Sequence, residues 1–178
     1  MIPLCRYTSE LASGLAYLHS HDLVHLDVKP ANALLTRHGH LKLADFGCCA
    51  RIDNDEDPVL GTVVYQAPEV LRGGAAGPHS DVFSLGVTIW HMLTRSTPYQ
   101  GIHPHVVLFQ VVHLRHRPTD HHPQESTHTT TTLEALLWHL ARSCWAEEPE
   151  DRPAVSDLCR TLNAMIMLSP EGGRMFGL

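Results

Sequence analysis

Four side chains in the first part of the chain have the types and spacing that phosphoryl transfer requires. They are Asp27, Lys29, Asn32 and Asp45. That reaction needs a carboxylate near the attacking hydroxyl, a cation beside the transferred group and ligands for metal ions. Asp27 is the candidate base, and Lys29 is placed to neutralise the phosphoryl group. Asn32 and Asp45 supply the oxygen ligands that Mg²⁺ prefers.

A short hairpin is predicted between the two candidate metal ligands. Residues 33–36 and 41–44 are apolar runs that flank the turn-forming segment 37–40. Pairing of these runs would bring Asn32 and Asp45 together, although they are distant along the chain. The sequence thus predicts that a hairpin assembles the metal-binding side of the site.

The rest of the chain is predicted to be mostly helical. Residues 80–93 are apolar on nearly every face, which is typical of a central, buried helix. Segment 47–68 lacks helical periodicity and is expected to be a long loop, and such loops in compact domains are usually functional. The other expected helices cover residues 7–19, 105–113, 133–144 and 154–168.

Three motifs follow one another in a recognisable order. H-L-D-V-K-P-A-N at 25–32 precedes D-F-G at 45–47 and A-P-E at 67–69. Together they resemble the signature set of the protein kinase family. The resemblance implies a mainly α fold with a small β-hairpin, the C-terminal (large) lobe of the kinase fold. It assigns residues 1–168 to that lobe and 169–178 to a loose tail.

The resemblance also implies which residues act on substrate and nucleotide. Thr62 would contact the base and the lysine and shape the acceptor site. Leu34 would form the floor for adenine. The implied cofactors are ATP and Mg²⁺. The implied catalytic residues are Asp27, Lys29 and Thr62, and the cofactor-binding ones are Leu34, Asn32 and Asp45, the last two as metal ligands.

A second set of residues has implied structural roles. His25 would be a packing and hydrogen-bonding residue close to Phe46. Asp81 would cap the backbone of the loop that carries Asp27. The remaining implied contact is a buried ion pair between Glu69 and Arg152.

Other residues indicate the kinase class. The lysine at position 29, together with Gly61 and Thr62 ahead of A-P-E, resembles the pattern of serine/threonine kinases. Leu26 and Cys48 in their motifs resemble the Mos kinases. That resemblance implies a protein substrate, a MAP kinase kinase in the MAPK cascade, and a role in oocyte meiosis.

Two kinase motifs do not occur in the sequence. It contains no G-x-G-x-x-G loop, which in kinases covers the phosphates of ATP. It also contains no V-A-I-K strand, whose lysine binds those phosphates. We therefore expect the N-terminal lobe to be absent and the chain to be a fragment or truncated form that needs that lobe for a full ATP site. The alternative is a non-catalytic interaction module that competes with the intact kinase.

Composition restricts the function classes further. The chain has 178 residues and a net charge of −6, which argues against a nucleic-acid binder. Five cysteines without a C-x-x-C pair favour a reducing compartment, and a cytoplasmic location is expected. The most apolar run, 82–93, is too short to span a membrane. Histidines clustered at 113–128 leave open a metal site, with a variable loop as the favoured interpretation.

Overall fold

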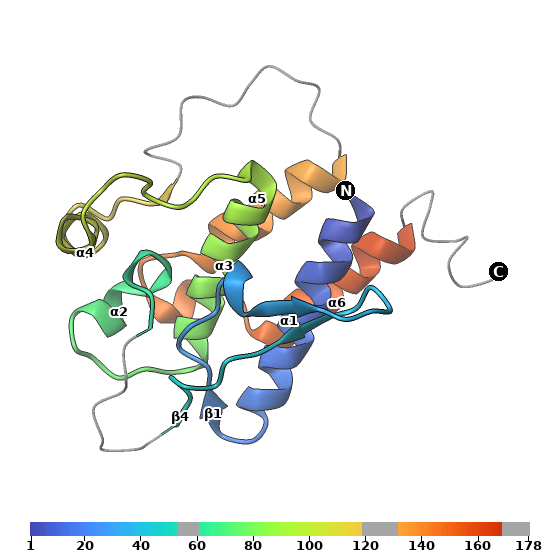
Figure 1. Cartoon of the computed structure of the whole chain (residues 1–178), viewed down its shortest axis with the longest axis horizontal. Coiled ribbons are helices and arrows are strands. Elements are labelled where there is room, and N and C mark those ends of the chain that lie inside the picture. The colour runs from blue at the N-terminus through green and yellow to red at the C-terminus, as the bar shows by residue number, and fades with distance from the viewer. Residues whose placement is uncertain (53–60, 119–131, 169–178) are drawn as a thin grey trace.

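The computed structural model describes residues 1–52, 61–118 and 132–168, and helices make up most of it (Figure 1). The α-helices are α1 (Ile2–His19), α2 (Pro68–Leu71), α3 (Pro78–Thr94), α4 (Pro104–His113), α5 (Thr132–Cys144) and α6 (Val155–Leu168). The strands are β1 (Leu23–Val24), β2 (Ala33–Leu35), β3 (Leu41–Leu43) and β4 (Ala50–Arg51). Short 3₁₀ turns are η1 (Pro30–Asn32), η2 (Val63–Tyr65) and η4 (Pro149–Asp151).

Helix α3 lies at the centre of the fold, as its all-round apolar pattern predicts (Figure 1). All residues from Ser80 to Trp90 are buried. Helix α5 packs against one side of α3 at Gly86, where a Cβ atom would lie 2.7 Å from Cys144 Cβ. The central helix therefore fixes the positions of the loops that flank it.

Helix α1 begins at Ile2, earlier than the predicted start at residue 7. Pro3 lies in its first turn, where proline is well tolerated because the N–H groups there have no partner within the helix. The helix runs antiparallel to α6: Ser9 donates a hydrogen bond to Asn163 at 2.8 Å, and one turn later Ser13 faces Cys159. Helix α1 in turn packs against strand β3 of the hairpin.

The predicted hairpin is present. Strands β2 and β3 pair antiparallel, with Ala33 opposite Leu43 and Leu35 opposite Leu41. Segment 47–68 was expected to be a loop without regular structure, but its described part contains short regular elements. Strand β4 pairs with β1, and η2 and the start of α2 follow. These elements are too short for residue periodicity to reveal them.

Among the described residues, no helix has the length and hydropathy that spanning a membrane would need.

The close contact between α3 and α5 gives a first testable prediction. Gly86→Ala is expected to destabilise the chain by about 1–3 kcal/mol, because the new methyl group would overlap Cys144 Cβ and approach the Ala141 carbonyl oxygen, which lies 2.9 Å away. Gly14→Ala in α1 is the matched control. There the nearest atom is 3.5 Å away, so the gain in helix propensity should stabilise the chain by about 0.5–1 kcal/mol.

Chemical denaturation followed by circular dichroism measures both changes. Equal stability changes for the two variants would contradict the packing that the structure gives for α3 and α5.

Candidate active site

The carboxylate of Asp27 is the centre of a compact hydrogen-bonded group. Lys29 Nζ lies 2.6 Å from Asp27 Oδ2 and 2.6 Å from Thr62 Oγ1. The backbone N–H of Thr62 donates to Asp27 Oδ1 at 2.9 Å, and Asn32 Nδ2 donates to Asp27 Oδ2 at 2.9 Å. The predicted contacts of Thr62 with Asp27 and Lys29 are therefore present.

These hydrogen bonds determine the charge of Asp27. Burial of the side chain raises its pKa, but the bonds from Lys29, Thr62 and Asn32 outweigh this effect, and the pKa lies below its ordinary value. Asp27 is therefore an ionised hydrogen-bond acceptor at neutral pH. Such a group can orient a hydroxyl and accept its proton only as the hydroxyl reacts.

Gly61 allows the segment before Thr62 to approach the carboxylate. A Cβ at this position would lie 2.5 Å from the Leu26 carbonyl oxygen and 2.7 Å from Asp27 Oδ1. No side chain fits in that space, so any other residue would displace Thr62 from Asp27. In the sequence Gly61 indicates only the kinase class, because its role in positioning depends on contacts with Leu26 and Asp27, which are distant along the chain.

The hairpin brings the two candidate metal ligands to neighbouring positions. Beyond the pair Ala33–Leu43, the Ala44 N–H donates to the Asn32 carbonyl at 2.8 Å, which places Asn32 beside the residue that precedes Asp45. The pKa of the Cys48 thiol is raised by burial and then by the negative charges of Asp27 and Asp45. Both carboxylates therefore lie within electrostatic reach of one thiol.

The two ligands differ in their surroundings. Asn32 is buried, and its Nδ2 donates to both the carbonyl and the carboxylate of Asp27, which leaves Oδ1 as its atom for a cation. Asp45 is exposed and has a left-handed backbone with φ of 61°. A buried amide oxygen beside an exposed carboxylate suits a hard cation such as Mg²⁺.

Asp81 anchors the loop that carries Asp27. Its carboxylate is fully buried and accepts hydrogen bonds at 2.8 Å from the N–H groups of His25 and Leu26. His19, at the end of α1, also contacts this carboxylate, with Nε2 2.9 Å from Oδ2. The predicted capping of the loop by Asp81 is present. The contact with His19 was not predicted, because a lone histidine in the last turn of a helix gives no chemical signal.

His25 lies in the core beneath the loop. Its ring contacts Phe46 edge to face, with centroids 5.5 Å apart, and its Nε2 lies 3.1 Å from the Ala44 carbonyl oxygen. The predicted proximity of His25 and Phe46 is present. The contact ties the loop before Asp27 to the end of the hairpin.

Glu69 and Arg152 form the predicted ion pair, but only Arg152 is buried, and Glu69 is half-buried. Two guanidinium nitrogens of Arg152 donate to the two carboxylate oxygens of Glu69 at 2.7 and 2.8 Å. Burial raises the pKa of Glu69, but the bonds and charge of Arg152, with a hydrogen bond from Ser80, lower it below its ordinary value. The pair holds the start of α2, after the Thr62 segment, against the C-terminal helices.

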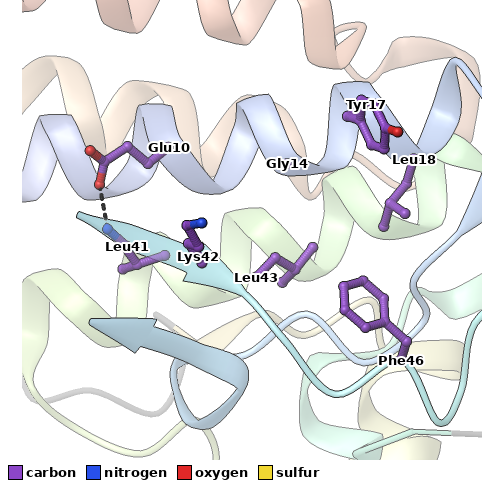
Figure 2. Close-up of a pocket in the computed structure, with 8 residues that line it drawn as sticks. All are labelled: Glu10, Gly14, Tyr17, Leu18, Leu41, Lys42, Leu43 and Phe46. Atoms are coloured by element: carbon purple, nitrogen blue, oxygen red, sulfur yellow. Dashed lines mark hydrogen bonds between the residues drawn. The ribbon is translucent and has the colours of Figure 1, made fainter. Parts of the chain in front are cut away.

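A pocket of about 280 Å³ lies between α1 and β3, beside the candidate site (Figure 2). Of the predicted site residues, only Phe46 lines it. Its other lining residues are Glu10, Gly14, Tyr17, Leu18, Leu41, Lys42 and Leu43.

Leu34, predicted as the floor for adenine, is 58% exposed on β2. The roles of base, cation, nucleotide floor and metal ligand stay predictions.

The histidine-rich stretch at 113–128, for which a metal site was left open and a variable loop favoured, lies partly outside the described residues. Within the part of the chain that the structure describes, no group of three or more His, Cys, Asp or Glu side chains could hold a metal ion.

Comparison with known proteins adds independent information. The model of the protein kinase domain matches residues 3–162. The serine/threonine-protein kinase-transforming protein mos of Moloney murine sarcoma virus (strain m1) is 34% identical over 166 residues, which cover 90% of this chain and 43% of that protein. The proto-oncogene serine/threonine-protein kinase mos of Mus musculus is 34% identical over 165 residues, 89% of this chain and 47% of the relative.

The serine/threonine-protein kinase mos of Patiria pectinifera is 36% identical over 166 residues, 88% of this chain and 45% of the relative. The chain thus spans less than half the length of these relatives. Since the domain model covers most of the sequence and the signature residues gather at one site, the chain belongs to the protein kinase family.

Proposed function

We propose that this chain carries the catalytic base and the metal ligands of a Mos-like serine/threonine protein kinase, which transfers a phosphoryl group from ATP to a protein hydroxyl. The observation that carries the proposal is the arrangement around Asp27. One lysine bridges Asp27 and Thr62 with two contacts of 2.6 Å, and Asn32 donates to the same carboxylate. A carboxylate, a cation and a metal ligand are thereby held in one place.

The proposed chemistry follows from these contacts. Asp27 accepts the proton of the substrate hydroxyl, and Lys29 neutralises charge on the transferred group. Asn32 and Asp45 hold Mg²⁺, which when bound neutralises the phosphate oxygens. Thr62 is bonded to both the lysine and the base and holds the two side chains together, so that the acceptor hydroxyl is directed at Asp27.

We propose further that this chain supplies only part of the ATP site. Leu34 and Leu35, successive residues of β2, are 58% and 59% exposed, and Phe46, which follows β3, is 54% exposed. Large apolar side chains left exposed in this way are typical of surfaces that another domain or molecule covers. An N-terminal kinase lobe over β2 would complete the adenine site, and the greater length of the relatives is consistent with such a lobe.

The resemblance to Mos supports a narrower proposal about the pathway. In this proposal the protein substrate is a MAP kinase kinase, and the enzyme acts in the cytoplasm within the MAPK cascade that controls oocyte meiosis.

The second candidate function is a non-catalytic kinase lobe that binds substrates or regulators in competition with an intact kinase. The observation that favours it is the exposed apolar surface at the pocket, where Tyr17 is 65% exposed and Phe46 is 54% exposed. Such a module would bind proteins without binding nucleotide through Asp45.

A nucleotide-binding experiment separates the two functions. Calorimetry with ATP and Mg²⁺ is expected to give an affinity weaker than micromolar for the 178-residue chain, because only part of the site is present. Mn²⁺ with ATP should nevertheless broaden the NMR signals of Asn32 and Asp45, since Mn²⁺ accepts the same oxygen ligands. Asp45→Asn should abolish this broadening.

Asp22→Asn is the matched control, because Asp22 is also an exposed loop aspartate with a left-handed backbone, at φ of 57°. It should leave the broadening unchanged. Broadening that persists in Asp45→Asn would refute Asp45 as a metal ligand. No broadening in the unmodified chain would favour the binding module, and micromolar affinity would refute the partial site.

A further inference from the structure

A hydrogen bond between Tyr65 and His91 joins the segment after Thr62 to the central helix. The Tyr65 hydroxyl and His91 Nδ1 are 2.7 Å apart, and the two rings are stacked with an interplanar angle of 17°. Tyr65 is the last residue of η2, and His91 lies in the last turn of α3. Two segments that are distant along the chain thus meet through a phenol and an imidazole.

The burial of Tyr65 determines which atom donates. Tyr65 is 6% exposed, and within the described ranges its hydroxyl has no other hydrogen-bond partner. A buried hydroxyl needs an acceptor for its hydrogen, so the phenol donates and Nδ1 of His91 accepts. A neutral imidazole that accepts at Nδ1 carries its hydrogen at Nε2. This bond therefore requires His91 to be neutral.

The position of Tyr65 is coupled to that of Thr62 and, through it, to Asp27. The Tyr65 N–H donates to the Thr62 carbonyl at 2.9 Å, and the Thr62 N–H donates to Asp27 Oδ1 at 2.9 Å. Burial and then the negative charge of Asp27 raise the pKa of Tyr65 to about 12, so the phenol lies within electrostatic reach of the candidate base. A change at the phenol is therefore transmitted to the residue that directs the acceptor hydroxyl.

Protonation of His91 would remove the acceptor that Tyr65 uses, because an imidazolium donates from both nitrogens. Burial lowers the pKa of His91 below its ordinary value, so the neutral form prevails at neutral pH. The ionisable side chains on elements that neighbour α3 include Tyr65 on η2, Asp27 and Lys29 before η1, Arg95 one turn further along α3, and Glu134, His139 and Arg142 on α5. No charge on these residues contributes to the lowered pKa of His91.

We propose that neutral His91 is a positioning residue for the acceptor segment, residues 61–65, and that its protonation in mildly acidic solution releases this segment from α3. His91 acts through Tyr65 and sets where Thr62 lies relative to Asp27. The consequence for catalysis rests on the proposed phosphoryl transfer, in which Thr62 helps to direct the acceptor hydroxyl. The displacement of Thr62 itself can be measured without nucleotide.

NMR spectroscopy of the full 178-residue chain, from about pH 8 to about pH 5, tests the proposal. The Thr62 amide signal should shift with the same midpoint as the His91 ring signals, below the ordinary histidine value of about 6.5. Asp27 stays ionised over this range, because its pKa lies below its ordinary value. The shift would therefore not arise from titration of the candidate base.

Two substitutions at His91 separate positioning from a purely structural role. His91→Asn keeps a hydrogen-bond acceptor but cannot be protonated, so it should hold the Thr62 signal near its position at about pH 8 and abolish the shift with pH. His91→Leu offers no acceptor and should displace the Thr62 signal at every pH. Thermal unfolding shows whether each variant keeps the fold, and the asparagine variant decides the result if the leucine variant does not.

His21→Asn is the matched control, because His21 also lies against a tyrosine ring, that of Tyr17, but is exposed. It should leave the response of Thr62 unchanged. A shift with pH that persists in His91→Asn would assign the response to another group and overturn the proposal. A Thr62 signal that stays in place while His91 titrates would also overturn it. No nucleotide or Mn²⁺ is added, so this result and that of the Asp45 experiment are independent.

Discussion

Replacing Arg152 with methionine is expected to lower the free energy of unfolding by about 3–5 kcal/mol, the usual cost of removing one partner of a buried ion pair. Arg152 is 3% exposed and donates to the carboxylate of Glu69 and to the carbonyl groups of Ala146, His79 and Glu147. Methionine keeps most of the side-chain volume but donates no hydrogen bond. The half-buried carboxylate of Glu69 would then keep the hydrogen bond from Ser80 but lose those from Arg152, and the three carbonyl oxygens would lose the donor that Arg152 supplies.

Arg160→Met is the matched control. Arg160 pairs with Asp157 one helical turn away, but its side chain is 80% exposed. Exposed pairs of this kind contribute about 0–1 kcal/mol. Urea denaturation at neutral pH compares the two variants. A loss for Arg152→Met no greater than that for Arg160→Met would mean that the Glu69–Arg152 pair does not stabilise the fold.

The same pair predicts a pH dependence. Folding lowers the pKa of Glu69, so the ionised pair stabilises the folded chain at neutral pH. This stabilisation is fully present above the ordinary glutamate pKa of about 4.3 and is lost as the pH falls through the lower folded value. Unfolding measured from neutral to acid pH should therefore show a smaller acid-induced loss in Glu69→Gln than in the unmodified chain.

Asp81→Ala is expected to destabilise the chain strongly and to release the loop that carries Asp27. The carboxylate accepts two backbone N–H groups, from His25 and Leu26, and each buried donor left without a partner costs about 1–3 kcal/mol. A total of about 2–6 kcal/mol follows from that range. Leu26 is also held at φ of 63°, a strained conformation for a leucine, so the freed loop would relax away from its present shape.

Asp157→Ala is the control for this prediction, because Asp157 also lies in the first turn of a helix but is 53% exposed. It should cost far less. The unfolding free energy and the NMR shift of the Leu26 amide would be measured for both variants. An Asp81→Ala chain with unmoved Leu26 signals and near-normal stability would show that the carboxylate does not hold the loop.

The sequence predicted the parts of the fold whose residue patterns are long or chemically unusual. The central helix was predicted because apolar side chains cover all its faces from Val82 to Leu93, and the hairpin because two apolar runs flank the turn at Gly39. Asp27 and its neighbours were predicted because their residue types match phosphoryl transfer.

Other features depend on contacts that no local pattern encodes. The pairing of β1 with β4 involves two residues on each strand, which is too few for alternation to be seen. The need for glycine at residue 61 arises from Leu26 and Asp27, which are distant along the chain. His19 acquires its role only because α3 brings Asp81 to the end of α1.

The contacts of Asp81 also affect how the loop before Asp27 exchanges hydrogen with solvent. Amides in loops usually exchange quickly through small local openings. The amides of His25 and Leu26 instead donate to a carboxylate on the central helix that has no contact with solvent. Their exchange therefore requires separation of the loop from α3, and they should exchange as slowly as core helix amides. The backbone beside the candidate base thus belongs to the most persistent part of the fold.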